Sequence, residues 1–201
     1  MVLAGGRGSR LGGEGKATVE LARRPLLGYV LEALTGALDD VAVAAKGSTA
    51  LPGSADGEAL RVPGSPRVAL WTEPDEPRHP LAGLRYALQR AGGRAVLAAA
   101  VDMPLITAPL VAEIAQAEAE GALAVVPVTG TRLQPLLARY DPGALEVLDT
   151  AGENAPLTAA VEALNPRTIE VADPELFFNV NSYDDLRVAA AELRRRRRNP
   201  A

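Results

Sequence analysis

Short apolar runs alternate with longer amphipathic stretches along most of the chain. Residues 41–45 and 94–101 are almost entirely small or branched apolar residues, which is typical of strands buried on both faces. Residues 25–37 begin with a proline and place five apolar side chains on one helical stripe, which predicts a helix. By the same reasoning we expect strands at 2–4, 41–45, 68–71, 94–101, 123–127, 134–140 and 168–171. Further helices are expected at 81–90, 109–120, 143–149 and 157–164, and from about residue 182 onward.

Strands that alternate with helices indicate an α/β fold with a mostly parallel, open sheet and helices on both faces, a three-layer arrangement. A chain of 201 residues fits a single domain. Residues 47–66 are rich in Gly, Pro and Ser, and we expect them to form a flexible surface insertion. Residues 194–201 form a basic tail. We expect its arginines to be a solvated, frayed helix end, favoured by the helix dipole, rather than a nucleic-acid site.

Composition excludes several classes of site and partner. The chain has no cysteine and a single histidine, which rules out disulfides, thiolate nucleophiles and polyhistidine metal sites. Its net charge of −4 argues against nucleic acid as a main partner. No apolar run reaches the length that crosses a membrane, so we expect a cytoplasmic protein without a membrane partner.

The first sixteen residues, MVLAGGRGSRLGGEGK, carry the most specific pattern. A short apolar run leads into a loop with glycines at 5, 6, 8, 12, 13 and 15, and with the cations Arg7, Arg10 and Lys16. Glycine allows tight turns and leaves backbone N–H groups free to face oxygen atoms, while arginine and lysine supply the opposite charge. The segment therefore predicts a phosphate-binding loop.

Two common phosphate loops do not fit this segment. A Walker A loop needs glycine five residues before its Gly-Lys pair and Ser or Thr after it. Here arginine and alanine, Arg10 and Ala17, stand at those places. The dinucleotide pattern G-x-G-x-x-G fails as well, because Leu11 stands where the third glycine belongs.

Two later segments place oxygen ligands at strand ends. Asp102 follows the buried run 94–101, and a carboxylate there faces the crevice in which open α/β sheets bind ligands. Magnesium is the cation that such a carboxylate would take, although an aspartate before a proline can also be a simple turn or N-cap residue. In the segment 177–186, Asn179 and Asn181 flank a valine and lie on one side of an extended strand. Asn181 or Ser182 could equally cap the last helix.

The pattern L-A-G-G-x-x-x-R-x-G-G-x-x-K resembles the signature of nucleotidyltransferases, and Leu3-Ala4-Gly5-Gly6 resembles the molybdenum cofactor guanylyltransferases among them. The resemblance extends from about residue 3 to residue 186. It implies a nucleotidyltransferase, Rossmann-like fold and transfer of GMP from GTP to the terminal phosphate of molybdopterin, with release of pyrophosphate. It also implies Mg²⁺ as cofactor, GTP and molybdopterin as partners, and transient contact with proteins that supply or receive the cofactor.

The resemblance also assigns roles to individual residues. Lys16, Arg10 and Asp102 are the expected catalytic residues, and Asp102 and Asn181 the expected metal ligands. The expected nucleotide site consists of Leu3, Ala4, Gly5, Gly6, Lys16, Glu73, Pro80, Leu81, Ala82, Gly83 and Asp102, with Asp75 as the substitute for Glu73. The expected acceptor site consists of Arg132, Gln134 and Asn179.

Three departures from the family pattern keep alternatives open. His79 replaces a glycine, Ala44 replaces an asparagine of some members, and the segment 152–156 is not basic as it usually is. The alternatives are the same reaction with CTP, transfer to another phosphorylated acceptor such as a sugar phosphate, and a non-catalytic nucleotide-binding module.

Overall fold

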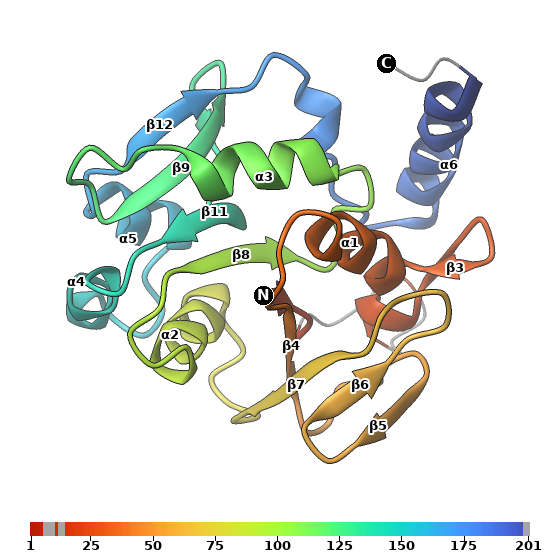
Figure 1. Cartoon of the computed structure of the whole chain (residues 1–201), viewed down its shortest axis with the longest axis horizontal. Coiled ribbons are helices and arrows are strands. Elements are labelled where there is room, and N and C mark those ends of the chain that lie inside the picture. Colours follow the sequence, from red (N-terminus) through yellow and green to blue (C-terminus); the bar gives the residue numbers. More distant parts are fainter. Residues whose placement is uncertain (6–10, 12–14, 199–201) are drawn as a thin grey trace.

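A computed structural model describes residues 1–5, 11 and 15–198 of the chain, and one sheet runs through its centre (Figure 1). Ten strands of the described chain form this sheet. In spatial order nine of them are β10 (Arg132–Leu133), β9 (Ala124–Thr129), β11 (Leu137–Tyr140), β8 (Val96–Ala100), β1 (Val2–Leu3), β4 (Ala42–Lys46), β7 (Val68–Glu73), β6 (Ala59–Arg61) and β5 (Ser54–Asp56). The tenth, β12 (Arg167–Glu170), pairs with β9.

The centre of the sheet is parallel and its margins are antiparallel. Strands β8, β1, β4 and β7 run in one direction, and Val2 of β1 lies between Val43 and Ala99 in register. Strand β11 pairs antiparallel with both β8 and β9, and β6 pairs antiparallel with β7. The parallel strands therefore end together at one edge, which is where α/β sheets place their ligands.

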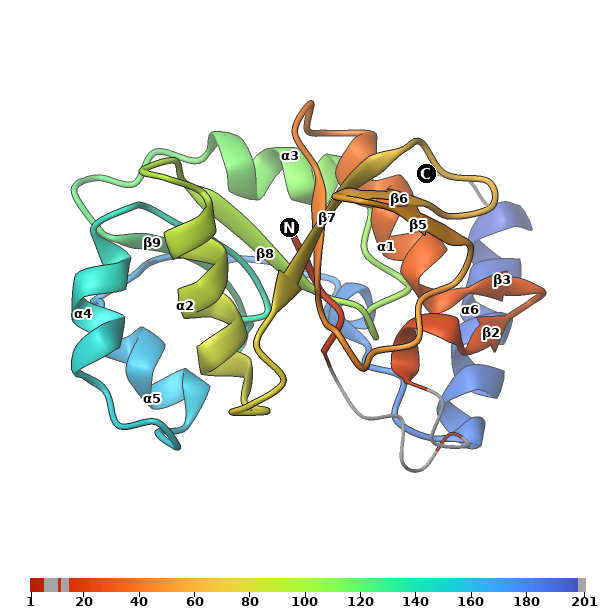
Figure 2. The ribbon, with the colours of Figure 1, turned by 90° about the horizontal axis from the view of Figure 1, so that it is seen from below.

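Helices cover both faces of this sheet (Figure 2). Helices α1 (Leu26–Thr35) and α3 (Ala108–Gln116) pack on one face, and α2 (Pro80–Arg90), α4 (Ala144–Thr150) and α5 (Leu157–Glu162) on the other. In β4, Val43 and Ala45 point into the first core while Ala42 and Ala44 point into the second, as the two-residue period of a strand requires. The expected three-layer, mostly parallel α/β fold is confirmed.

The last helix, α6 (Tyr183–Arg198), does not cover the sheet. It packs beside the small hairpin of β2 (Glu20–Leu21) and β3 (Arg24–Pro25), where Leu21, Tyr29 and Ala189 belong to a third buried cluster. Two short 3-10 turns, η1 (Lys16–Thr18) and η2 (Pro174–Phe177), precede α1 and α6. No helix in the described ranges is long and apolar enough to cross a lipid bilayer.

Several predicted boundaries differ from the structure, and two of the differences have a clear physical reason. The strand expected at 134–140 begins only at Leu137, because Pro135 lacks the N–H that a ladder needs, and Gln134 lies outside the strand. The helix expected to reach residue 120 ends at Gln116, and Glu120 adopts a positive φ of 53° that no helix continues through.

The segment 47–66 is not an irregular insertion along its whole length. Strands β5 and β6 form a hairpin within it, and β6 extends the sheet beyond β7. Leu60 is fully buried against the first core. The Gly, Pro and Ser content concealed this hairpin, because only 59–62 carry apolar alternation. The flexibility of the rest of the segment stays a prediction.

The interpretation of Arg194–Arg198 as a merely solvated helix end is wrong for two of its arginines. Arg195 donates to Glu192 and Glu175, and Arg196 donates to Glu192 and to the carbonyl of Leu105. Glu192 lies three and four residues before these arginines, the spacing at which helical side chains meet. The run therefore ties α6 to the loops beside it.

We predict that Glu192→Gln lowers the melting temperature by about 2–4 °C at pH 7. The guanidinium groups of Arg195 and Arg196, which donate hydrogen bonds to Glu192, lower the pKa of this carboxyl from 4.5 to about 2. Its contribution is thus complete above pH 4.5 and is lost as the pH falls toward 2. Circular dichroism melts should show that the difference in melting temperature between wild type and Glu192→Gln becomes smaller from pH 5 to pH 3.

Glu113→Gln is the matched control for this prediction. Glu113 lies on the exposed face of α3 and has no ion pair among those found in the described part of the chain. Its substitution should change stability by no more than about 0.5 kcal/mol. A gap between wild type and Glu192→Gln that stays constant with pH would contradict the proposed network.

Candidate functional site

Two adjoining pockets open at the edge where the parallel strands end. The first pocket has a volume of about 240 Å³, and the loops after β1, β4, β7 and β8 form its walls. The second pocket, of about 630 Å³, lies between the turn around Gln134, helix α5 and the segment before α6. Pro80, Leu136 and Asn179 line both pockets, so the two share a wall. Two ligands bound side by side would meet there.

Lys16 connects both pockets. Its ammonium donates to Asp102 Oδ2 at 2.5 Å and to Asn181 Oδ1 at 2.6 Å. Lys16 and Asp102 line the first pocket, and Asn181 lines the second. A backbone hydrogen bond of 2.8 Å from Val180 N–H to the Asp102 carbonyl holds the two oxygen-bearing segments beside each other.

Asp102 and Asn181 lie as close together as a shared cation requires. Both oxygens touch the same nitrogen, so their separation cannot exceed the sum of 2.5 and 2.6 Å. The other carboxylate oxygen, Asp102 Oδ1, is buried and has no hydrogen-bond partner among the described residues. Buried polar atoms are nearly always paired, so this oxygen is suited to an additional ligand.

The carboxamide of Asn181 is free for this contact because other residues cap α6. Ser182 Oγ accepts from Asp185 N–H, and the Asp185 carboxylate accepts from the N–H groups of Asn181 and Ser182. This is a capping box with aspartate in the place of glutamate. These hydrogen bonds also lower the pKa of Asp185. The alternative in which the Asn181 side chain caps α6 is therefore wrong, and Ser182 is the capping residue.

A buried ion pair lies at the far side of the first pocket. Lys46 Nζ and Glu73 Oε2 are 3.6 Å apart, and their side chains are only 4% and 6% exposed. The Lys46 ammonium also donates to the carbonyls of Pro74, at 2.7 Å, and Pro77, at 3.2 Å. Burial raises the pKa of Glu73, and the nearby Lys46 opposes this shift.

Glycines from two predicted motifs surround the Glu73 carboxylate. A Cβ atom on Gly5 would lie 2.7 Å from Glu73 Oε1, closer than real Cβ contacts allow. A Cβ atom on Gly83 would lie 3.6 Å from Glu73 Oε2. Glu73 therefore requires glycine at position 5, which explains physically why a side chain is missing there.

Most of the predicted nucleotide-binding residues lie together. Those lining the first pocket are Leu3, Gly5, Lys16, Glu73, Pro80, Gly83 and Asp102. The side chains of Ala4 and Leu81 instead lie in the two hydrophobic cores, so only their backbone could face a ligand. Ala82 is not among the lining residues. Gly6 and Arg10 lie outside the described residues. The individual roles stay predictions.

The three predicted acceptor residues also lie together, in the second pocket. Arg132 is exposed on β10, and Gln134 is buried and donates to Thr129 Oγ1 at 3.3 Å. Asn179 donates to the carbonyl of Phe177, which orients its carboxamide. Sequence reasoning missed Thr158 and Glu162 of helix α5, which line the same pocket. Nothing in their spacing distinguishes them from ordinary helix-surface residues.

The first pocket holds two cations that the sequence interpretation did not select, Lys46 and Arg78. Lys46 had a usable signal, because it ends a buried strand as Asp102 follows one. His79 lines the pocket too, but its Nδ1 accepts from Leu81 N–H at 3.3 Å and caps helix α2. Asp75, the substitute for Glu73, is exposed and binds Ser48 outside the pocket.

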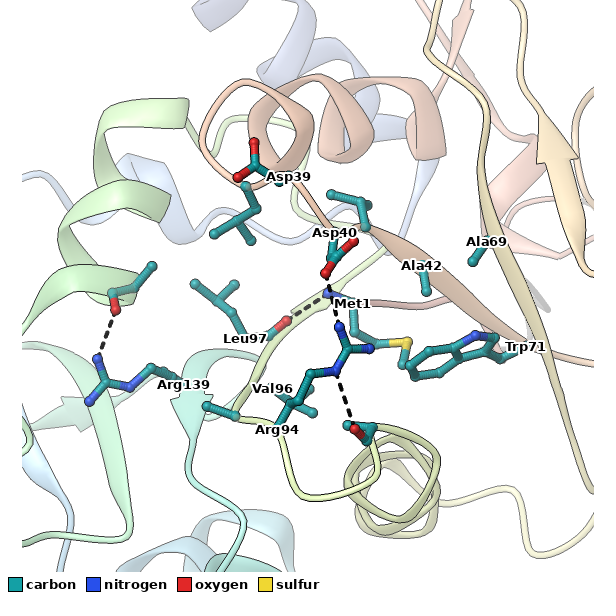
Figure 3. A pocket seen from close by; sticks show the side chains of 15 residues that line it. Met1, Asp39, Asp40, Ala42, Ala69, Trp71, Arg94, Val96, Leu97 and Arg139 are labelled. Atoms are coloured by element: carbon teal, nitrogen blue, oxygen red, sulfur yellow. Dashed lines mark hydrogen bonds and ion pairs between the residues drawn. The ribbon is translucent and has the colours of Figure 1, made fainter.

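A separate hollow lies at the opposite, amino end of the sheet, around Met1 and Trp71 (Figure 3). Two of its polar groups are paired: Arg94 pairs with Asp40, and the Met1 amino group donates to the Leu97 carbonyl. None of the predicted site residues lines this hollow. We therefore place the functional site at the carboxyl edge, where the predicted residues gather around two pockets.

Comparison with known proteins identifies the family of this chain. The model of the MobA-like NTP transferase domain matches residues 1–167. A molybdenum cofactor guanylyltransferase of Cereibacter sphaeroides is 33% identical over 97% of this chain and 96% of its own length. A probable molybdenum cofactor guanylyltransferase of Bacillus licheniformis is 30% identical over 92% and 93% of the two chains.

Solved structures share the fold at lower identity. The molybdopterin-guanine dinucleotide biosynthesis protein A of Archaeoglobus fulgidus aligns with a TM-score of 0.70 and 23% identity over 96% of this chain and 97% of its own. The 2-C-methyl-D-erythritol 4-phosphate cytidylyltransferase of Thermus thermophilus aligns with a TM-score of 0.64 and 20% identity over 96% and 98%. The paired pockets, the lysine between them and these matches lead to one conclusion: the chain belongs to the MobA-like NTP transferase family and is a nucleotidyltransferase.

Proposed function

We propose that the protein transfers GMP from GTP to the terminal phosphate of molybdopterin and releases pyrophosphate. One observation carries this proposal: the Lys16 ammonium lies between Asp102 and Asn181, where a pocket for a nucleotide adjoins a pocket for an acceptor. The names of full-length relatives at about 33% identity support guanylyl transfer to the molybdenum cofactor.

In this reaction an oxygen of the acceptor phosphate forms a bond to the α-phosphorus of GTP. The bond between the α-phosphorus and the bridging oxygen breaks, and pyrophosphate leaves with the electron pair. The transfer needs no covalent nucleophile, which agrees with a chain that has no cysteine. Catalysis then consists of positioning the two phosphates and stabilising their charge.

Residues of both pockets contribute to this positioning and charge stabilisation. Lys16 holds the triphosphate and stabilises the charge that develops on the leaving pyrophosphate. The shared wall formed by Pro80, Leu136 and Asn179 brings the acceptor phosphate beside the α-phosphate. Arg132 and Gln134 contact the acceptor at the other end of the second pocket.

The residues present also fit a magnesium ion. Within residues 1–5, 11 and 15–198, Asp102 Oδ1 is buried without a hydrogen-bond partner, and Asp102 Oδ2 and Asn181 Oδ1 already contact a cationic group. In the described ranges no three His, Asp or Glu side chains cluster as metal ligands. Magnesium commonly takes one or two carboxylates plus substrate phosphates, so Asp102 and Asn181 suffice to hold it. When bound, the ion would neutralise phosphate charge between nucleotide and acceptor.

The acceptor is the less constrained part of this proposal. Among the described residues that line the second pocket, Arg132 is the only cation and Glu162 is the only carboxylate. The segment 152–156 adds no positive charge. These charges favour, as a second candidate, a phosphorylated acceptor less anionic than molybdopterin. The chemistry at Lys16 would be unchanged.

We predict that GTP binds more tightly than CTP or ATP in the presence of magnesium. The glycines at positions 5 and 83 carry no side chains that would take up space for a purine, and the Glu73 carboxylate beside them can accept hydrogen bonds from the base. Titration calorimetry with the four nucleoside triphosphates measures the preference, and a pyrophosphate-release assay with and without molybdopterin measures transfer. Equal affinities, or a preference for CTP, would refute guanylyl transfer and leave the family assignment in place.

Lys16→Ala should lower the turnover number by about 10²–10³, because a charge placed at the developing negative charge is lost. The variant should fold, since Lys16 begins the short turn η1 and belongs to none of the three hydrophobic clusters. Steady-state pyrophosphate release and a thermal melt test both statements. Arg194→Ala on the exposed side of α6 is the control and should stay within about twofold of wild type. A Lys16→Ala enzyme with nearly normal turnover would exclude the role of Lys16.

Gly5→Ala should weaken nucleotide binding by about tenfold or more while the protein stays folded. Its Cβ would lie 2.7 Å from Glu73 Oε1, and the buried carboxylate must then leave its position. Gly152→Ala is the matched control, because a Cβ there meets nothing within 4 Å and its φ is not positive. Calorimetry on both variants decides, and equal affinities for the two would show that the position of Glu73 is unimportant.

A further inference from the structure

Lys46 is a buried cation that the mechanism above does not use. It ends strand β4 and is only 5% exposed, although lysine is almost never fully buried unless it is paired. Its ammonium donates to the carbonyls of Pro74 and Pro77. These two bonds fix the ammonium beside the Glu73 carboxylate, 3.6 Å from Oε2 and beyond normal hydrogen-bond distance.

Glu73 faces the first pocket with the Lys46 ammonium as its cationic neighbour, 3.6 Å from Oε2. The residue is 7% exposed, and its two oxygens lie next to Gly5 and Gly83, which have no side chains. A carboxylate has about four acceptor sites, and a single long contact leaves most of them open. A ligand that supplies N–H groups therefore gains by binding there.

The charges around Glu73 come from several elements. Lys46 on β4 and Arg78 in the loop before α2 lower the pKa of Glu73, while burial raises it. The pKa of Tyr86 on α2 is raised by burial and also by the negative charge of Glu73. Lys16, Asp102 and His79 line the same pocket. Of the cations that lower this pKa, Lys46 has the larger effect, and it is also the more deeply buried.

We propose that Lys46 is a positioning residue for nucleobase choice: it holds the Glu73 carboxylate ionised and aimed into the pocket, so that the pocket selects a base with two adjacent N–H donors. This inference rests on the proposed function. Guanine presents such an edge through its N1–H and its N2 amino group, and a carboxylate can accept both at once.

The other bases present a mismatched edge to an ionised carboxylate. Adenine and cytosine each place a ring-nitrogen acceptor beside their amino group, and this lone pair would face a carboxylate oxygen. Hypoxanthine keeps the N1–H of guanine but has no amino group, so inosine triphosphate tests a single hydrogen bond. A site built to accept a hydrogen bond rejects an analogue that lacks the donor.

The first experiment measures the ratio of GTP affinity to inosine triphosphate affinity by titration calorimetry with magnesium. Wild type should favour GTP by about tenfold or more, since one hydrogen bond to a charged acceptor is lost with inosine triphosphate. Lys46→Met and Lys46→Gln should both reduce this ratio to within about threefold of unity. Lys46→Arg, which keeps the charge, should retain most of it.

The comparison of Lys46→Gln with Lys46→Met separates charge from loop support. Glutamine can still donate to the carbonyls of Pro74 and Pro77, whereas methionine cannot. If Lys46 only supports that loop, Lys46→Gln will keep the wild-type ratio, and the inference is overturned. Arg85→Met is the matched control elsewhere, because Arg85 likewise donates to two carbonyls, of Leu148 and Ala151, outside both pockets. It should keep the wild-type ratio.

A pH series gives a second readout that a purely structural role would not move. Without the Lys46 charge, burial should raise the pKa of Glu73 further, so GTP affinity should begin to fall at a higher pH in Lys46→Met than in wild type. The double variant Lys46→Met/Glu73→Gln removes both charges, so it leaves no unpaired buried charge that could unfold the protein. It should fold, bind GTP weakly and show no pH dependence from this pair. Coincident pH profiles of wild type and Lys46→Met would overturn the inference.

The outcomes for wild type distinguish this inference from the proposed function. A preference for GTP over CTP and ATP, without discrimination between GTP and inosine triphosphate, overturns the role of Lys46 alone. A preference for CTP overturns both. Strong discrimination by wild type that both Lys46→Met and Lys46→Gln lose, and that Lys46→Arg keeps, supports both.

Discussion

The contact of one ammonium group with two oxygens connects the parts of this molecule that matter for its chemistry. Lys16 meets Asp102, which is 86 positions later in the chain, and Asn181, which is 165 positions later. The first contact requires β1 and β8 to lie side by side, and the second also requires the segment after η2 to lie beside them. The parallel centre of the sheet makes this possible, because its strands deliver their following loops to one edge.

Much of this arrangement could be predicted from the sequence. The alternation of apolar runs and amphipathic stretches predicted the layers, since both periods follow from backbone geometry alone. The juxtaposition of Asp102 and Asn181 followed from strand ends together with the family resemblance. The side chains of Ala4 and Leu81 lie in the cores instead, because a motif indicates which segment approaches a ligand but not which atoms of it face the ligand.

Other features depend on contacts between distant residues, which local pattern does not reveal. The hairpin of β5 and β6 depends on the pairing of β6 with β7, and its loop-like composition hid it. From the sequence, Arg195 and Arg196 belong to a run of solvated arginines. In the folded chain they donate to Glu175, Asp173 and the carbonyl of Leu105, which lie far from them in the sequence. Lys46 becomes informative only once Glu73 is placed 3.6 Å away on the neighbouring strand.

The placement of Asn181 has a consequence for how much of the chain the site requires. The family model matches residues 1–167, yet one of the two oxygens that contact Lys16 comes from residue 181, just before α6. A stretch of chain limited to the matched residues would contain the parallel centre of the sheet, Lys16 and Asp102, and would still lack this oxygen. The centre between the two pockets therefore depends on a segment that lies outside the matched domain.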